Sequence, residues 1–193
     1  IVKNKKNYGF CKANNDAIKL ALAQKSDYIL LLNNDTVVTK LFLTTLVSNM
    51  EKEEKIGACS PLILYYKTNK IWSRGGKIIS FSSLTKMIDK KHIFSEKIGD
   101  LEPDFLTGCA LFIKRKVIKK VGFLDERFFA YYEDVDYSYR IKRAGYKIKV
   151  FSGSIIYHKK SASAGRRGSD KFSKLQVYLL MKNSLIVLKR IYK

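Results

Sequence analysis

An acidic side chain follows a short apolar run near the start of the chain, in the sequence Asn33-Asn34-Asp35-Thr36. The Asp35 carboxylate could bind Mg²⁺ or Mn²⁺, and Asn33 offers a neutral oxygen or a hydrogen bond to a phosphate or sugar. Ligands of open α/β sheets bind beyond the carboxyl ends of strands, so such a motif is well placed. Asn and Asp also favour turns by bonding to their own backbone, and this motif alone favours a turn over a metal site.

A second acidic group, Glu133-Asp134-Val135-Asp136, follows an aromatic run and begins a predicted helix. The positive end of a helix dipole keeps carboxylates ionised, and an ionised carboxylate near an acceptor hydroxyl is a general base. Asp136 and Arg140 have the spacing of an ordinary i,i+4 ion pair, and we favour this structural role for Asp136. Glu133 and Asp134 could cap the helix, and for Asp134 capping and catalysis are compatible.

Two weaker signals lie elsewhere in the chain. The small residues of Thr107-Gly108-Cys109 enter a predicted strand, where Gly would let a ligand approach the backbone, although a tight strand start explains them almost as well. His158 ends the last predicted strand. A lone His is more often structural, but one beside a hard-metal site is a candidate ligand for a metal or a diphosphate.

Alternating helix and strand patterns position these residues. We expect helices over 13–24, capped by Asn14 or Asn15, and over 41–55, 116–121 and 133–144, with strands over 27–32, 57–66, 107–113, 147–151 and 154–158. The nearly continuous apolar run at 27–32 suggests a parallel strand buried on both faces. Residues 67–100 have weak periodicity and predict irregular hairpins or a flexible loop. The alternation predicts an α/β fold with an antiparallel or mixed strand late in the chain.

Composition limits the class of protein. The 193 residues are 46% hydrophobic, which favours one globular domain with a real core over disorder. Apolar stretches fall well short of the roughly 20 residues that span a membrane. Three scattered cysteines provide no disulfide framework and suit a reducing cytosol.

The net charge of +21 favours polyanionic partners, unless it only reflects a Lys-rich codon usage. Residues 159–193 carry ten basic residues and one acid, and so contribute +9. We expect a mobile loop over 159–168 and a helix over 170–192. That helix could pack on the domain or lie on an anionic membrane surface.

The order of the motifs is more specific than any one of them. From residue 4 to 160 the chain resembles family 2 glycosyltransferases of the GT-A fold, and most of all the rhamnosyltransferase-like branch that builds bacterial surface polysaccharides. The resemblance rests on Asn7-Tyr-Gly-Phe10, Asn14-Asn15, Leu32-Asn-Asn-Asp-Thr36, Thr107-Gly-Cys-Ala110, Gly122-Phe-Leu-Asp-Glu126, Phe128-Phe129, Tyr132-Glu-Asp-Val-Asp136, Arg140, Gly145 and His158.

This resemblance implies a GT-A α/β domain over 1–160, with a mostly parallel central sheet flanked by helices, followed by a basic loop and an amphipathic helix over 161–193. Family members begin with nucleotide-binding strands that do not precede Ile1, so we expect the first strands to be missing. The implied reaction is inverting transfer of a sugar from a nucleoside diphosphate sugar to a hydroxyl of a glycan or lipid-linked acceptor.

The resemblance also implies roles for individual residues. Asp35 and Asn33 stand at the family's D-x-D metal motif, whose first Asp is Asn here, and imply a divalent metal, Mg²⁺ or Mn²⁺, with His158 as a further candidate ligand. Asp134 matches the catalytic base, with Glu133 beside it. Substrate-binding segments match at Thr107, Gly108 and Cys109, near the donor sugar and acceptor, and at Asn7, Gly9 and Asn15, which border the nucleotide pocket.

A non-catalytic basic module that binds anionic membrane or nucleic acid is the alternative. Nucleic acid is an unlikely partner, because the aromatic run at 128–132 adjoins three carboxylates that would repel phosphates. Membrane association through 159–193 is compatible with catalysis, since a lipid-linked acceptor would be presented there. We therefore expect a cytoplasmic enzyme, peripheral at the inner face of the cell membrane.

Overall fold

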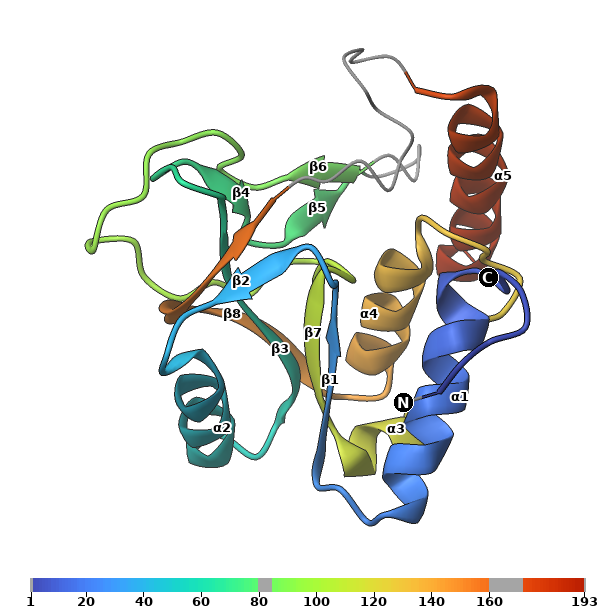
Figure 1. The fold of residues 1–193 in the computed structure, drawn as a ribbon, viewed down its shortest axis with the longest axis horizontal. Coiled ribbons are helices and arrows are strands. Elements are labelled where there is room, and N and C mark those ends of the chain that lie inside the picture. The colour runs from blue at the N-terminus through green and yellow to red at the C-terminus, as the bar shows by residue number, and fades with distance from the viewer. Residues whose placement is uncertain (1, 80–84, 160–171, 193) are drawn as a thin grey trace.

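A computed structural model describes residues 2–79, 85–159 and 172–192 (Figure 1). The helices are α1 (Phe10–Ala23), α2 (Phe42–Lys52), α3 (Arg115–Val121), α4 (Glu133–Arg143) and α5 (Lys174–Ile191). The strands are β1 (Tyr28–Leu32), β2 (Thr36–Val38), β3 (Ile56–Tyr65), β4 (Ile71–Ser73), β5 (Gly76–Ile78), β6 (Thr85–Met87), β7 (Ala110–Lys114) and β8 (Lys147–His158).

The main sheet has the order β1-β7-β3-β8-β2, with β4 paired to β3. Strands β3 and β8 run parallel, whereas β7 runs antiparallel to both of its neighbours, and β2 and β4 are antiparallel to theirs. The expectation of a mostly parallel sheet is therefore wrong. All five residues of β7 are buried. Strand β1, whose apolar run predicted a parallel strand buried on both faces, is instead an edge strand antiparallel to β7, and only Ile29 and Leu31 of its five residues are buried.

Helices cover both faces of the sheet, which confirms the α/β class (Figure 1). Side chains alternate along the strands: Leu111 and Ile113 of β7 join the core under α1, α3 and α4, and Phe112 points to the opposite face. There Phe112 packs in one cluster with Leu46 and Met50 of α2. Burial of these two apolar layers is the main stabilising contribution to the fold.

Helix α1 begins at Phe10, three residues earlier than predicted. Its N-cap is Gly9, so neither Asn14 nor Asn15 caps the helix. Gly9 has φ of +84°, and a Cβ there would lie 2.6 Å from the carbonyl oxygen of Phe129. The Phe10 N–H donates to the same oxygen at 2.7 Å. A contact with a residue about 120 positions away thus decides where the helix starts.

Two other segments differ from or refine the predictions. The two late strands form one strand, β8, with an irregular register beside Pro61 and Leu62 of β3. Within 67–100, strand β4 and the β5–β6 hairpin confirm the predicted hairpins. Strand β7 starts at Ala110, so residues 107–109 form a loop before the strand.

Helix α5 packs against the domain, which answers one question that the sequence left open (Figure 1). Its inner face buries Gln176, Leu179, Asn183 and Val187, at helical spacing. The predicted loop over 160–168 lies outside the described residues. Among the helices that the structure describes, none combines the length and the apolar character needed to cross a membrane.

Candidate active site

The loop at 107–109 links the two acidic motifs. The N–H of Gly108 donates to Oδ2 of Asp134 at 2.9 Å. The carbonyl oxygen of Cys109 accepts from the N–H of Asn33, also at 2.9 Å. Asp134 and Asn33 are about 25 and 75 positions from this loop in the sequence. These two hydrogen bonds hold both of them against it, and Asn33 directly follows the end of β1.

Cys109 is a buried thiol in this loop. Burial raises the pKa of its thiol to about 12, and the charges of Asp35 and Asp134 add to that effect. A thiol with so high a pKa is not a nucleophile at neutral pH. Gly108 lies in the turn before β7 and not in the strand, and a Cβ there would lie 3.3 Å from the Phe10 ring and 3.5 Å from Oε1 of Glu133. The glycine thus lets these two side chains pack closely, and a ligand contact at Gly108 stays a prediction.

Asp134 is oriented by the backbone. Its Oδ1 accepts from the N–H of Val135 at 2.9 Å, while Oδ2 accepts from Gly108. Burial raises the pKa of Asp134, and the backbone N–H groups that bond to it oppose that rise. Hydrogen bonds to the ionised form favour it, so these two N–H groups fix the direction of the carboxylate and offset part of the effect of burial. The residue as a whole is half-buried.

Glu133 has the opposite environment. The residue is 8% exposed, and its Oε2 has no hydrogen-bond partner in the part of the chain that the structure describes. Burial, followed by the charge of Asp134, raises the pKa of Glu133 to about 8. Burial without a hydrogen-bond partner at Oε2 thus favours the protonated form of Glu133. Two adjacent carboxyl groups with different environments are a common arrangement for two different roles.

The backbone before these acids is strained. Tyr131 and Tyr132 have φ of +70° and +69°, the left-handed region that bulky residues rarely adopt. Tyr132 is the N-cap of α4, so this turn sets the direction from which Glu133 and Asp134 enter the helix. Strain of this kind persists where surrounding contacts enforce it, and it clusters at functional sites.

Asp35 and His158 form the second part of the site. Oδ1 of Asp35 lies 3.1 Å from Nε2 of His158, and both side chains are largely buried. The register of β2 on β8 pairs Thr36 with His158 and so brings them together. The Trp72 ring packs against the imidazole with 4.3 Å between centroids. Burial lowers the pKa of His158, while Asp35 opposes that change, so the imidazole stays neutral as a metal ligand requires.

These donors suit a hard divalent cation that completes its shell with other ligands. Mg²⁺ is typically held by one or two carboxylates together with substrate phosphates and water. Among residues 2–79, 85–159 and 172–192, no cluster of three or more His, Cys, Asp or Glu could hold a metal by itself. Asn33 lies in the same turn and has a side-chain amide. The backbone carbonyl oxygen of Asn33 accepts from the Thr36 hydroxyl at 2.7 Å. The predicted turn is present and carries the metal candidates.

The residues predicted to border the nucleotide pocket divide into two groups. Asn7 and Gly9 line a cavity of about 560 Å³ between the start of α1, the loop at 129–131 and the start of α5. Asn15 lies elsewhere: its amide bonds to Glu126 and to both backbone groups of Leu124, and the residue is 2% exposed. Its role here is to hold the loop at 122–126, and a substrate contact by Asn15 stays a prediction without structural support.

The sequence over residues 28–168 matches the family described as "Glycosyl transferase family group 2". The chain belongs to this family. Together with the fold, this match confirms the resemblance on which the assignment of Asp35 and Asp134 rests. The roles of the individual site residues stay predictions.

Two relatives with curated names agree with this family assignment. The "Low-salt glycan biosynthesis hexosyltransferase Agl10" of Haloferax volcanii is 26% identical over 192 residues, which cover 96% of this chain and 59% of that protein. The "N-acetylglucosaminyl-diphospho-decaprenol L-rhamnosyltransferase" of Mycobacterium tuberculosis is 37% identical over 62 residues, which cover 32% of this chain and 20% of that protein. The second relative supports the rhamnosyltransferase-like resemblance. The chain thus spans about three fifths of the first relative's length.

A solved structure shows the fold independently. GalNAc-T7, determined with UDP, GalNAc and Mn²⁺, superposes with a TM-score of 0.68 at 20% identity, over 97% of this chain and 36% of that one. The GT-A fold of the family 2 chain is therefore confirmed, with its mixed sheet and flanking helices.

One group of residues in the site carried no sequence motif that we recognised. Asn183 and Gln176 of α5 bond to the loop that precedes Glu133. The available signal was an Asn on the apolar face of the last helix, four residues from both Leu179 and Val187. A buried amide at such a position needs hydrogen-bond partners.

Proposed function

We propose that this chain is the catalytic part of an inverting, metal-assisted glycosyltransferase. It transfers a sugar from a nucleoside diphosphate sugar to a hydroxyl of a glycan or lipid-linked acceptor in surface polysaccharide synthesis. The observation that carries the proposal is that both acidic motifs bond to the loop at 107–109, Asp134 through the N–H of Gly108 and the turn of Asp35 through the bond from Asn33 to Cys109. The family of the chain and its named relatives support the reaction class.

Asp134 is the general base of this mechanism. It removes the proton of the acceptor hydroxyl as that oxygen attacks the anomeric carbon, from the face opposite the diphosphate. The new glycosidic bond forms while the bond from the anomeric carbon to the diphosphate oxygen breaks, and the configuration inverts. One base and no protein nucleophile suffice, which agrees with the high pKa of the Cys109 thiol.

The two carboxyl groups divide their work. Glu133, with its pKa raised to about 8, holds a proton at neutral pH and adds no second charge beside the base. Burial raises the pKa of Asp134 as well, but the N–H groups of Gly108 and Val135 bond to its two oxygens, oppose that rise and favour its ionised form. These bonds also fix the direction in which the carboxylate presents its free lone pairs.

Asp35 and His158 would hold a divalent metal, Mg²⁺ or Mn²⁺, and Asn33 of the same turn would supply an amide oxygen. When bound, such an ion neutralises charge on a diphosphate leaving group. The Mn²⁺ and UDP in the GalNAc-T7 structure support this part of the proposal. We expect His158→Ala to weaken Mn²⁺ binding at least tenfold in a paramagnetic titration, whereas His92→Ala, a matched change at an exposed His, leaves it unaltered. Equal Mn²⁺ affinity in both variants would remove His158 from the site.

The stereochemistry of the product tests the reaction itself. Incubation with nucleoside diphosphate sugars and Mn²⁺, followed by NMR of the product's anomeric proton, should show the configuration opposite to that of the donor. A product with retained configuration would refute a single displacement with Asp134 as base, because retention requires a second displacement or a different geometry.

We further propose that the enzyme lies at the inner face of the cell membrane through the outer face of α5. Tyr178, Met181, Leu185 and Tyr192 follow one another at helical spacing and are 54–66% exposed. Lys174, Lys182 and Lys189 accompany them, and α5 contains no acidic residue. An apolar stripe with basic neighbours fits an anionic lipid surface, whereas two copies of this face would oppose like charges.

Vesicle co-sedimentation tests this surface without removing α5. The variant Met181→Glu/Leu185→Glu should lose binding to phosphatidylglycerol vesicles, and Leu41→Glu, which alters an exposed Leu beside α2, should keep it. Undiminished binding by the double variant would place the membrane contact elsewhere.

A further inference from the structure

The inner face of α5 carries a buried amide aimed at the loop before the acidic pair. Nδ2 of Asn183 donates to the carbonyl oxygens of Ala130 and Tyr131, both at 2.8 Å. Asn183 is fully buried, and within the described part of the chain its Oδ1 has no partner. Leaving a buried polar atom unpaired costs free energy, and a Leu of similar size would avoid that cost. The presence of an amide at position 183 is therefore explained by the two hydrogen bonds that its Nδ2 donates.

The loop that Asn183 binds is the strained turn at Tyr131 and Tyr132. Both residues have positive φ, and the next two residues are Glu133 and Asp134. A turn in this conformation relaxes unless its surroundings hold it. Asn183 supplies two hydrogen bonds to the backbone at the start of the turn, and Gln176 of the same helix donates to the Tyr131 hydroxyl at 2.9 Å.

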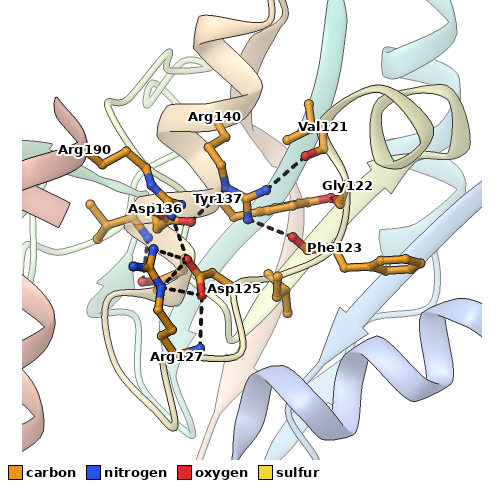
Figure 2. A network of polar contacts seen from close by, with 12 residues as sticks. Val121, Gly122, Phe123, Asp125, Arg127, Asp136, Tyr137, Arg140 and Arg190 are labelled. Atoms are coloured by element: carbon orange, nitrogen blue, oxygen red, sulfur yellow. Dashed lines mark hydrogen bonds and ion pairs between the residues drawn. The ribbon is translucent and has the colours of Figure 1, made fainter. Parts of the chain in front are cut away.

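A second attachment lies one turn into α4. Figure 2 shows Arg190 of α5 between two carboxylates, Asp136 of α4 and Asp125 of the preceding loop. The guanidinium of Arg190 bonds to Asp125 at 2.7 Å, and Asp136 also accepts from Arg140 at 2.9 Å. Helix α5 therefore holds the segment from 125 to 136 at points on both sides of Asp134.

We propose that Asn183 is a positioning residue for the base Asp134. By holding the left-handed turn, it fixes the start of α4 and hence the carboxylate that Gly108 orients from the other side. This inference rests on the proposed function, because it presumes that Asp134 acts in transfer. It assigns to the last helix a part in catalysis that its sequence motifs do not show.

The test compares two variants on the same face of α5. Asn183→Leu removes both hydrogen bonds to the loop and keeps the volume. Val187→Ala, at a residue 1% exposed in the shared core, removes packing and touches neither carbonyl. Both variants are measured for unfolding in urea, for kcat and KM of transfer, and for hydrogen exchange at the amide of Asp136, which donates to Tyr132 at 2.9 Å.

We expect Asn183→Leu to lower kcat about tenfold or more, with KM for the donor within about threefold, because a small displacement of a reacting group is costly in rate. Exchange at the Asp136 amide should become faster. Val187→Ala should lose stability and keep the wild-type kcat. A kcat of Asn183→Leu that stays at the wild-type value, or that falls only as much as that of Val187→Ala, would overturn the positioning role.

Asp134→Asn, assayed in parallel, distinguishes the two possible failures. Wild-type turnover in Asp134→Asn would refute the base assignment and this inference with it. An inactive Asp134→Asn together with a fully active Asn183→Leu would refute the positioning role alone.

Discussion

Replacing Glu133 by Gln should remove a pH dependence from the stability of the protein. Gln resembles the protonated carboxyl group, which is the form that the buried site favours. Burial raises the pKa of Glu133 from 4.5 to about 8 in the folded state. The folded protein then binds this proton more tightly than the unfolded chain does. The resulting stabilisation is complete below the unfolded pKa and is lost as the pH rises through the folded pKa.

The expected magnitude follows from these two pKa values. One pKa unit corresponds to about 1.4 kcal/mol, so between pH 5 and pH 8 the wild type should lose on the order of 3 kcal/mol of unfolding free energy relative to Glu133→Gln. Urea unfolding followed by circular dichroism at pH 5, 6, 7 and 8 measures this difference. The comparison of two proteins at each pH cancels the titration of all other groups that the substitution leaves alone.

A matched control is Glu54→Gln. The Glu54 side chain is 88% exposed, and its hydrogen bond with Lys116 lowers its pKa, so it stays ionised over this whole range. Its pH dependence should follow that of the wild type. Parallel curves for the wild type and Glu133→Gln would mean that Glu133 is ionised at neutral pH, and the division of roles between Glu133 and Asp134 would be wrong.

Three further changes test the contacts that shape the site. Gly9→Ala should lower the unfolding free energy by about 2 kcal/mol or more in urea, since φ is +84° and the new Cβ would meet the Phe129 carbonyl at 2.6 Å. Lys114→Met should cost about 1–3 kcal/mol by the same assay, because the buried ammonium bonds to three carbonyls at the end of α2. Arg190→Met should cost about 1–3 kcal/mol, because Asp136 would lose one buried charged partner and keep the other, Arg140. For each variant, a urea midpoint equal to that of the wild type would contradict the prediction.

Local patterns predicted the parts of the site that depend on one element each. The dipole argument placed Glu133 and Asp134 at the start of α4, and the i,i+4 spacing predicted the pair that Asp136 and Arg140 form at 2.9 Å. The residues near them likewise predicted the turn after β1 and the end of β8. The contacts that bring these parts of the site together form between distant segments, and local patterns do not show them. The hydrogen bond from Asn33 to Cys109 is an example.

The failures have the same physical origin. Asn14 and Asn15 are good capping residues, yet α1 starts at Gly9 because Phe129 approaches it. The apolar run of β1 predicted a parallel strand buried on both faces, yet β1 lies at the edge of the sheet and pairs antiparallel with β7, a distant segment. The second partner of Asp136, Arg190, lies 54 residues further on. Such long-range contacts depend on the packed fold. In the sequence, the only sign of the contacts made by Asn183 was a polar residue on an apolar helix face.

Transfer by Asp134→Asn is the measurement that tests the central claim most directly. Donor binding and sugar transfer are measured for the wild type, for Asp134→Asn and for the control Asp16→Asn, which changes a carboxylate on α1 that pairs with Lys12. The proposed base predicts that Asp134→Asn binds the donor with affinity close to that of the wild type and transfers about 100-fold more slowly or worse, while Asp16→Asn is fully active. Transfer by Asp134→Asn at the wild-type rate would contradict the account.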